Sequence, residues 1–466
     1  MPATPASSEP SAPEGLARRL GPFDAAAIIV SNVIGGGILF TPPQVAASVP
    51  SAPLFLLIWL AGGALAFAGA LAYAELAAMT PRAGGEYVYL RRAFGPVAAF
   101  LTGWTSFVAG FSGAIATSAL VFAFYLGRFV PWAADATPYL TVSPVPGVLT
   151  FTLSPRTLTA IALIALMAAV HRRGVGPGRA VGNLLASLKV TALVAFVVMA
   201  VGFGAGDAGH LVVTGHVPAT GWLLALIPVM FTYSGWNAAS YVAEEIRNPG
   251  RNVPRALAMG TAGVAVLYLA LNAIYLYVWP VGELAAIKGS VLDVVAERLL
   301  GAVAGNVMGI VALISLSASI SAMTFAGPRV YFAMARDGAF LPAAGRIHPR
   351  YQTPAAAIVA QAVWSVLLVL AGDATDALVS YTGFALVLFS GIAVAALFVL
   401  RVREPAAPRP FRTWGYPWLP ALYVLVSAGI LVNGLIRQPG PTGAGLVVIA
   451  AGLPLYAWFR RRGPAA

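Results

Sequence analysis

Residues 23–48 read FDAAAIIVSNVIGGGILFTPPQVAAS, and this stretch decides the fold. It is apolar and long enough to cross a membrane, because about 20 apolar residues span a hydrocarbon core of ~30 Å. Gly35, Gly36 and Gly37 follow one another about 20 Å in from Phe23, at a rise of 1.5 Å per residue. Each glycine weakens a helix interior by about 1 kcal/mol relative to alanine. We therefore predict a membrane-spanning helix that is broken past the bilayer midplane.

A second stretch of this kind occupies residues 221–245 and reads GWLLALIPVMFTYSGWNAASYVAEE. Ser234 and Gly235 lie about as far in from the opposite face, and Pro228 precedes them. Close helix packing at glycine explains either stretch taken alone. Two glycine-interrupted spans at corresponding positions of two halves, however, are typical of transporters built from inverted repeats, with a binding site near the midplane.

The composition excludes several classes of protein. The chain has 466 residues, of which 59% are hydrophobic and only 9% are charged, whereas a soluble domain has about 25% charged residues. A soluble enzyme and a disordered chain are therefore excluded. The net charge of +12 comes from basic residues spread between apolar runs, so no nucleic-acid partner is expected. With no Cys and no phosphate-binding loop, we expect no cofactor, no metal site and no ATP-driven pump.

The apolar runs predict an all-α integral membrane protein with twelve transmembrane helices. These are expected at residues 23–48, 53–79, 96–128, 157–171, 181–204, 220–243, 255–280, 302–333, 354–372, 378–400, 418–436 and 442–459. Residues 1–20 are rich in Pro, Ala and Ser and are expected to form a disordered tail without a cleavable signal. We expect a first five-helix repeat at 21–204, a second at 220–400, and two trailing helices at 401–461.

The basic residues predict the orientation in the membrane. One alternate set of connecting segments holds 22 Lys and Arg residues and the other holds 5. Cytoplasmic loops carry the excess of positive charge, so both termini are expected in the cytoplasm. The chain itself is expected in the cell (inner) membrane. The even number of predicted spans agrees with this.

The breaks predict the chemistry of the binding site. A broken helix exposes N–H groups at its new N-terminus and carbonyl groups at its new C-terminus. The backbone amides of Gly36, Gly37 and Ile38, just beyond Gly35, are expected to donate to a carboxylate. Glycine at this place lets a ligand approach the chain closely. Acceptors for an ammonium are expected at the carbonyls of Val33, Phe231, Thr232 and Ser234. A donor nest beside an acceptor cluster suits the zwitterionic end of an α-amino acid.

Lys189 is the one basic residue expected deep in the membrane, about 14 Å from the cytoplasmic end of the fifth span. A charge there is costly and indicates a function, because the side chain is too short to reach water. It is either a fixed positive charge or, with a pKa lowered by burial, a proton carrier. In the eighth span Ser315 and Ser319 share one helical face and Ser317 and Ser321 share another. Either one pair meets the lysine, or all four line helix interfaces.

Several other signals carry weaker expectations. Asp24 is expected to cap the first helix, and Glu75 to lie at the cytoplasmic interface. Glu244, Glu245 and Arg247 either form a gate of ion pairs with Arg82 or Arg336 or remain solvated. His171, His210, His216 and His348 are expected at span ends or in loops, which argues against a proton relay.

Five segments resemble the amino acid–polyamine–organocation superfamily, and its L-type neutral amino-acid transporter branch with bacterial exchangers most closely. FTYSGWNAASYVAEEIRNPGRNVPRAL (231–257) resembles its sixth-helix signature, and IIVSNVIGGGILFTP (28–42) its first-helix motif. PRAGGEYVYLRRAFG (81–95) is similar to its loop after the second helix. The remaining matches are PRVYFAMARDGAFLP (328–342) with IHPRYQTP (347–354), and RPFRTWGYPWLP (409–420). The likeness covers nearly the whole chain.

The resemblance implies a LeuT-type fold with a 5+5 inverted repeat and broken helices 1 and 6. By position, Gly36 and Gly37 match carboxylate-binding residues, and Val33, Phe231 and Ser234 match the carbonyls that hold the amino group. Phe231 also matches an aromatic gate, Asn237 a polar residue near the pocket, and Lys189 a lysine that replaces a sodium ion. Ser234 and Gly36 depart from the common pattern, which bears on side-chain selectivity. Without Cys, the disulfide-linked partner subunit of the animal members is excluded.

We therefore expect a sodium-independent secondary transporter of neutral L-amino acids, working by exchange or with protons, and not an enzyme. A transporter of cationic amines or polyamines is the alternative, and it should offer a buried carboxylate at mid-depth. A membrane-embedded enzyme would need clustered titratable residues, and a sensor would need a soluble output domain. Neither pattern is present in the sequence.

Overall fold

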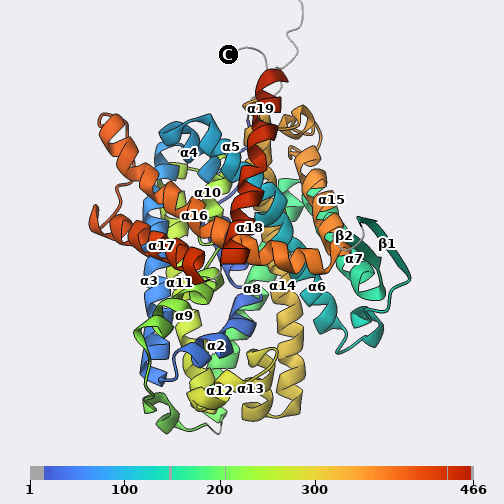
Figure 1. Ribbon diagram of the computed structural model, residues 1–466, viewed down its shortest axis with the longest axis vertical. Helices are drawn as coiled ribbons and strands as arrows, with labels where there is room; N and C mark the ends of the chain where they lie inside the picture. The colour runs from blue at the N-terminus through green and yellow to red at the C-terminus, as the bar shows by residue number, and fades with distance from the viewer. Residues whose placement is uncertain (1–14, 146–148, 205, 438, 463–466) are drawn as a thin grey trace, which may run out of the picture.

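A computed structural model describes residues 15–145, 149–204, 206–437 and 439–462. The described chain is mostly helical (Figure 1), with one two-stranded sheet. The length and hydropathy of its helices confirm the predicted class, an integral membrane protein built of helices. The expected tail at residues 1–20 lies largely outside the described residues, which begin at Gly15.

The first half of the chain contains these elements: α1 (Pro22–Val33), α2 (Gly37–Ser48), α3 (Ala52–Met79), α4 (Glu86–Phe94), α5 (Pro96–Thr105), α6 (Phe111–Leu126), β1 (Leu140–Val145), β2 (Leu149–Leu153), α7 (Pro155–Arg172) and α8 (Val175–Phe203). A π-helical turn (Ser106–Gly110) joins α5 to α6, so the two form one span of 31 residues. α7 begins at Pro155 behind a capping serine, with the Thr157 amide donating to Ser154 Oγ at 3.3 Å.

The second half contains these elements: α9 (Ala219–Thr232), α10 (Ala238–Tyr241), α11 (Pro249–Val278), α12 (Val281–Ala286), α13 (Val291–Leu300), α14 (Ala302–Arg336), α15 (Ala355–Ala371), α16 (Asp373–Arg403), α17 (Trp418–Arg437), α18 (Pro439–Ala450) and α19 (Gly452–Arg462). Short 3₁₀ turns at Pro131–Ala134, Ala208–Val212, Ala243–Glu245 and Pro342–Gly345 complete the connections.

The break in the first span is confirmed. α1 ends at Val33 and α2 begins at Gly37, and the two helices meet at an angle of 48°. The sixth stretch is broken as well, because α9 ends at Thr232 and α10 begins only at Ala238. Gly235 in that gap has a φ of +96°, which side chains rarely adopt, so glycine is needed for the turn.

The number of spans is only partly matched. Within the described ranges, eight helices are long and apolar enough to cross a membrane, and the bent pair α1–α2 makes nine. α7, α9 and α15 were predicted as spans too, but they have 18, 14 and 17 residues and are not among these nine. The span predicted at 378–400 lies within α16, and the segment Gly383–Arg403 of that helix is one of these nine.

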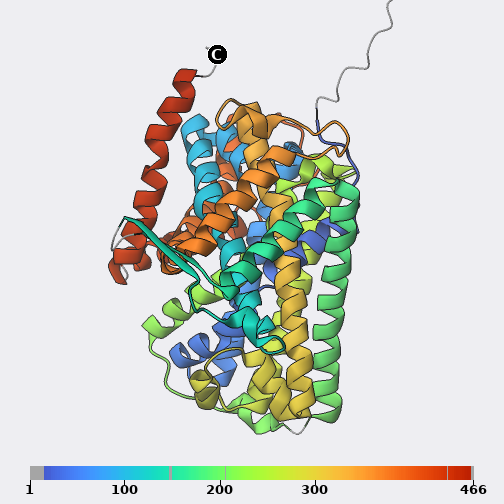
Figure 2. The same cartoon turned by 90° about the vertical axis from the view of Figure 1, so that its right-hand side faces the viewer.

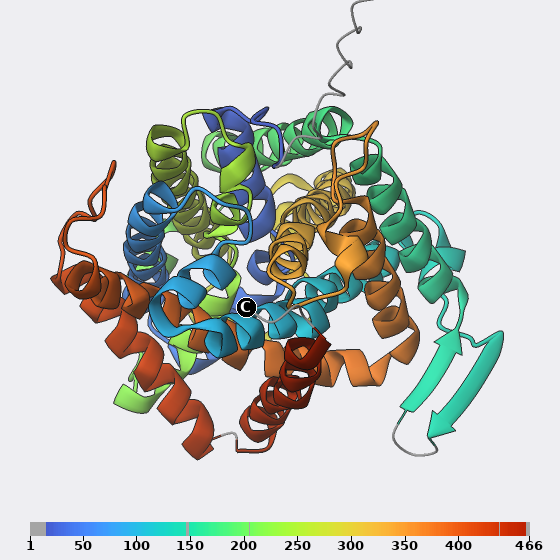
Figure 3. The ribbon, with the colours of Figure 1, turned by 90° about the horizontal axis from the view of Figure 1, so that it is seen from above.

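The helices divide into an inner and an outer set. In α14, 72% of the span is buried, and in α3 61%, against 17% in α17. Figure 3 shows α17 to α19 and the β1–β2 hairpin on the outside of the bundle. Because α14 and α3 are enclosed by other helices, their polar side chains need partners inside the protein.

Some elements were not predicted from the sequence. The connection after α6 carries the antiparallel hairpin β1–β2, with Leu140 opposite Leu153 and Val145 opposite Leu149. Between α11 and α14 lie the short helices α12 and α13, at one end of the molecule (Figure 1). α19 and the chain leading into α1 lie at the other end (Figure 2). We call this second end the terminal face.

Candidate functional site

The two broken helices pass each other closely at Gly37. A Cβ atom placed on Gly37 would lie 3.1 Å from the Cα, Cγ2 and Oγ1 atoms of Thr232, which is tighter than ordinary van der Waals contact. A Cβ on Gly35 would lie 3.3 Å from Ser319 Oγ. The glycine run therefore lets the break lie against α9 on one side and α14 on the other.

The first turn of α2 offers backbone donors as expected. Gly36 is its N-cap and has no side chain to cap the turn. The amides of Gly37 and Ile38 have no acceptor within α2, because the first N–H groups of a helix have none. Gly36 and Gly37 are partly exposed, whereas Ile38 is buried. These amides are suited to an anionic group at the break.

Three of the four carbonyls expected to hold an ammonium, those of Val33, Phe231 and Thr232, already have protein partners. Tyr268 Oη donates to Val33 O at 2.8 Å and lies 3.3 Å from Thr232 O. The Ser234 amide donates to Phe231 O at 3.0 Å. A carbonyl oxygen has two lone pairs. Val33 O uses both, because it also accepts from the Gly35 amide at 2.9 Å, whereas Thr232 O can still accept a second bond. Sequence reasoning missed Tyr268, a buried residue of α11 that ties the two breaks together.

Two side chains near the sixth-helix break have different surroundings. Phe231 has 43% of its surface exposed, although it belongs to a helix that packs on α2 and α3. The Asn237 amide instead donates to Glu86 Oε1 at 2.7 Å and to Tyr241 Oη at 3.0 Å. In this conformation Asn237 is therefore committed to α4 and α10, and Ser234 stays partly exposed at the break.

Lys189 lies within α8 and is buried, as its place in an apolar run indicated. It is completely buried, and its Nζ donates to Ser31 O at 3.2 Å and to Ile34 O. Both carbonyls belong to the C-terminal end of α1, which carries partial negative charge. The lysine Nζ thus lies among carbonyl oxygens at the end of α1.

Two serines of α14 share these acceptors. Ser315 Oγ donates to Ile34 O at 3.1 Å, and Ser319 Oγ lies 2.8 Å from Ser31 O and 3.1 Å from Ile34 O. Of the two faces left open by the sequence, Ser315 and Ser319 are the pair that meets the lysine's site. Ser321, on the other face, bonds instead to His171 Nε2 at 2.9 Å.

The segment before α1 is hydrogen-bonded to the sixth-helix region at the terminal face. The Leu20 amide donates to Glu245 O and the Arg247 amide donates to Leu20 O, both at 2.9 Å. Glu244 accepts from the amides of Leu16 and Ala83, at 2.9 Å and 3.0 Å. The chain therefore passes across the end of the sixth-helix region and fastens it to the loop after α3.

The expected ion-pair gate is partly right and partly wrong. Glu244 does pair with Arg336, at 3.3 Å. Glu245 pairs with neither candidate but with Arg329, at 2.7 Å, and both side chains are buried. Arg82 lies 3.9 Å from Asp337 instead, and Arg247 has no carboxylate within 4.0 Å among the described residues. The pattern could not favour Arg329, because its face on α14 depends on how that helix packs.

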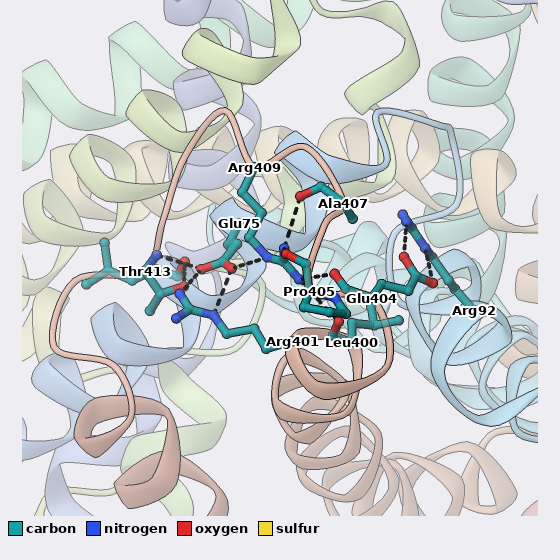
Figure 4. Close-up of polar contacts among 10 residues, drawn as sticks. Glu75, Arg92, Leu400, Arg401, Glu404, Pro405, Ala407, Arg409 and Thr413 are labelled. Carbon is teal, nitrogen blue, oxygen red and sulfur yellow. Dashed lines mark hydrogen bonds and ion pairs between the residues drawn. The ribbon is translucent and has the colours of Figure 1, made fainter.

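Glu75 corrects a second expectation. It does not lie at an interface with water but is fully buried (Figure 4). Arg401 donates to it through two nitrogens, at 3.0 Å and 2.6 Å, Arg409 Nε lies 3.2 Å away, and the Thr413 amide donates at 2.7 Å. Figure 4 also shows Arg92 paired with Glu404 beside this cluster. The connection from α16 to α17 is thereby fastened to α3.

Glu86 is the residue that sequence reasoning missed altogether. It begins α4, is 6% exposed, and accepts from Tyr73 Oη at 2.6 Å as well as from Asn237. No Lys, Arg or His lies within 4.0 Å of its carboxylate in the described ranges. Burial raises the pKa of Glu86 above its usual value, although the hydrogen bonds from neutral donors oppose this. A glutamate among aromatic residues in GGEYVYL was the available signal.

The remaining expectations have mixed outcomes. Asp24 does close the first turn of α1, with the Gly21 amide donating to its Oδ2 at 2.6 Å. His171 lies in the last turn of α7, as expected for a span end, and its side chain is buried. Among the described residues, no three His, Cys, Asp or Glu side chains are grouped so that they could hold a metal ion.

The similarity to known proteins extends over the helices described above. The sequence pattern of the family described as "Amino acid permease" matches residues 20–457, nearly the whole chain. The match includes both breaks, Lys189 and the α14 serines.

Individual relatives are similar over the same length. The "Large neutral amino acids transporter small subunit 2" of Rattus norvegicus is 31% identical over 448 residues, which cover 95% of this chain and 80% of the relative. The "Asc-type amino acid transporter 1" of Mus musculus is 29% identical, covering 95% and 81%. The "Cystine/glutamate transporter" of Homo sapiens is 29% identical, covering 95% and 85%.

Proposed function

This chain belongs to the amino acid permease family, and from that premise we propose that it carries neutral L-amino acids across the membrane without sodium. Membership makes it a multi-pass membrane transporter of amino acids and not an enzyme. The absence of Cys excludes a disulfide-linked partner subunit. The relatives named for large neutral amino acids support the choice of substrate class.

The observation that carries the proposal is the lysine at the end of α1. Lys189 Nζ is held by the carbonyls of Ser31 and Ile34, which also accept from Ser319. Carbonyl and hydroxyl oxygens around a helix C-terminus are ligands suited to a cation. A covalently attached ammonium at this position supplies the charge that a bound sodium ion would otherwise bring, so transport needs no sodium.

The substrate is proposed to bind beside this lysine, at the two breaks. Its carboxylate would accept from the amides of Gly36, Gly37 and Ile38, with Gly35 allowing the approach. Its ammonium would donate to carbonyls around the breaks, those of Val33, Phe231, Thr232 and Ser234, and the Val33 carbonyl would become available once one of its two present donors moves away. The partly exposed Phe231 would cover it, and Asn237 would line the pocket only after leaving Glu86.

The proposed architecture is a LeuT-type fold of twelve spans, with inverted repeats at 21–204 and 220–400 and trailing helices at 401–461. Both termini would lie in the cytoplasm, because the terminal face collects the basic loops. Alternating access would then exchange the closed terminal face for an open one. The contacts of Glu244, Glu245 and the segment before α1 would break in each cycle.

Uptake into proteoliposomes of the purified full chain tests the function. Labelled L-amino acids are supplied in sodium-free buffer, with and without amino acid inside and with and without an inward proton gradient. We expect uptake of neutral amino acids without sodium. Dependence on internal amino acid would establish exchange, and a response to the proton gradient in empty vesicles would establish symport. Uptake that requires sodium, or only polyamine uptake, would contradict the proposal.

A further inference from the structure

Three glutamates are buried near the terminal face, and they differ in one respect. Glu75 is paired with Arg401 and Arg409, and Glu245 is paired with Arg329. Glu86 is enclosed to a similar degree, yet its recorded partners are the neutral groups of Tyr73 and Asn237. A buried carboxylate without a cation is far more costly than a buried ion pair or a buried carboxylic acid.

The groups that face Glu86 come from every element around it, and all of them are neutral in their ordinary state. The hydroxyls of Tyr241 and Thr102 also face the carboxyl, and Tyr89 and Tyr423 are close enough to be influenced by its charge. The cations on α16 and α14, two helices that pack against α4, are engaged elsewhere. On α16, Arg401 is paired with Glu75 and Arg403 donates to Ala93 O. On α14, Arg329 is paired with Glu245 and Arg336 with Glu244. These pairings leave the carboxyl uncompensated if it is charged.

The position of Glu86 connects it to the moving parts of the proposed transporter. Its carboxyl joins α4 to Tyr73 of α3 and to Asn237, which follows Ser234 at the sixth-helix break by three residues. α4 and α10 lie near each other toward the terminal face (Figure 1). Any opening of this face that carries α10 away from α4 would break the bond to Asn237 and admit water to the carboxyl.

We propose that Glu86 is a proton-binding site that holds a proton while the terminal face is closed and releases it to water when that face opens. The inference rests on the proposed transport function. Its physical basis is the difference in environment, because water stabilises the carboxylate in the open form and the enclosed site favours the neutral acid. In the closed form Tyr73 and Asn237 both donate to Oε1, which leaves Oε2 to carry the proton.

The sign of the pH dependence follows from this. The closed form binds the proton more strongly than the open form, so a fall in pH favours closure and slows the opening step. A rise in pH ionises Glu86 and favours opening. The effect is confined to pH values above the ordinary glutamate pKa of about 4.3, because below it the carboxyl is protonated in both forms.

The test is exchange of a labelled neutral amino acid in proteoliposomes of the full chain, with equal pH on both sides. The wild-type rate is expected to fall as the pH falls, by up to about tenfold per pH unit, the limit for one proton. Glu86→Gln, which copies the neutral acid in shape, is expected to be slow and independent of pH. Glu283→Gln removes an exposed carboxylate of α12 and is expected to follow the wild type.

Two further measurements separate a proton site from a merely structural residue. Tyr73→Phe removes a donor that favours the charged form, so the midpoint of the pH profile should move to higher pH. The infrared band of a protonated carboxylic acid should grow in the wild type as the pH falls, and this change should be reduced in Glu86→Gln. The same pH profile in the wild type and Glu86→Gln, or no change in that band, would overturn the inference. If the expected difference in the band is found but the protein does not exchange amino acids, the proposed transport function is wrong and the proton site stands.

Discussion

At the scale of single residues, the break in the first span depends on glycines, which have no side chain, and on the terminal nitrogen of Lys189. Gly37 has no Cβ where Thr232 passes, and Lys189 places its Nζ between two carbonyls of α1. Both features concern a few ångströms of space, so single substitutions should affect them directly.

Gly37→Val is expected to abolish most substrate uptake. The added side chain begins 3.1 Å from Thr232, and overpacking of this kind costs about 1–3 kcal/mol. At about 1.4 kcal/mol per factor of ten, uptake should fall about tenfold or more. Gly263→Val is the matched control, because a Cβ on that α11 glycine meets no atom within 4 Å. Wild-type affinity in Gly37→Val would contradict the proposed binding mode.

Lys189→Ala is expected to cripple transport, while Lys288→Ala should leave it unchanged. The two are the only lysines of the chain, and Lys288 is exposed. Losing the ammonium removes two hydrogen bonds from a charged donor, each worth about 1.5–3 kcal/mol. The measurement is initial uptake in sodium-free vesicles at several pH values. An unchanged rate with an unchanged pH dependence would remove the lysine's role.

At the scale of elements, buried ion pairs determine how helices are fastened near the terminal face. Glu75 ties α3 to the connection between α16 and α17, and Glu245 ties the sixth-helix region to α14. The guanidinium of Arg329 also lies 3.9 Å from the centre of the Phe325 ring and donates to Phe325 O at 2.6 Å. These contacts keep the pair dry.

Breaking the Glu245–Arg329 pair on one side should be worse than removing both charges. Arg329→Met leaves a buried carboxylate without its cation, a loss of about 3–5 kcal/mol in the free energy of unfolding. Adding Glu245→Gln to Arg329→Met should recover much of that loss. Thermal unfolding of the purified variants measures both effects. A double variant no more stable than Arg329→Met would show that the pair's charges are not what fastens these helices.

At the scale of the whole molecule, the absence of Cys makes orientation measurable. A single introduced cysteine is the only thiol in the chain. Arg346→Cys, before α15, and Lys288→Cys, between α12 and α13, are exposed positions in connections predicted on opposite sides. An impermeant thiol reagent applied to intact cells should label Lys288→Cys and not Arg346→Cys until the cells are opened. The reverse pattern would place the termini outside.

By itself the sequence determined the membrane class, the position of both breaks and the burial of Lys189. Hydropathy and glycine runs are local properties, and Lys189 is the only basic residue deep within an apolar run, so its burial needed no knowledge of packing. The sequence also led to the family, because several motifs recur in order.

Tertiary structure alone decided which buried charges have partners. Glu75 meets Arg401, which lies 326 residues away, and Glu245 meets Arg329 rather than Arg82. Glu86 instead meets neutral hydroxyl and amide groups, among them those of Tyr73 and Asn237. Helical periodicity says which face of a helix is apolar, but the rotation and height at which two helices pack fix which side chains meet. That difference separates a stable ion pair from a carboxyl able to bind a proton.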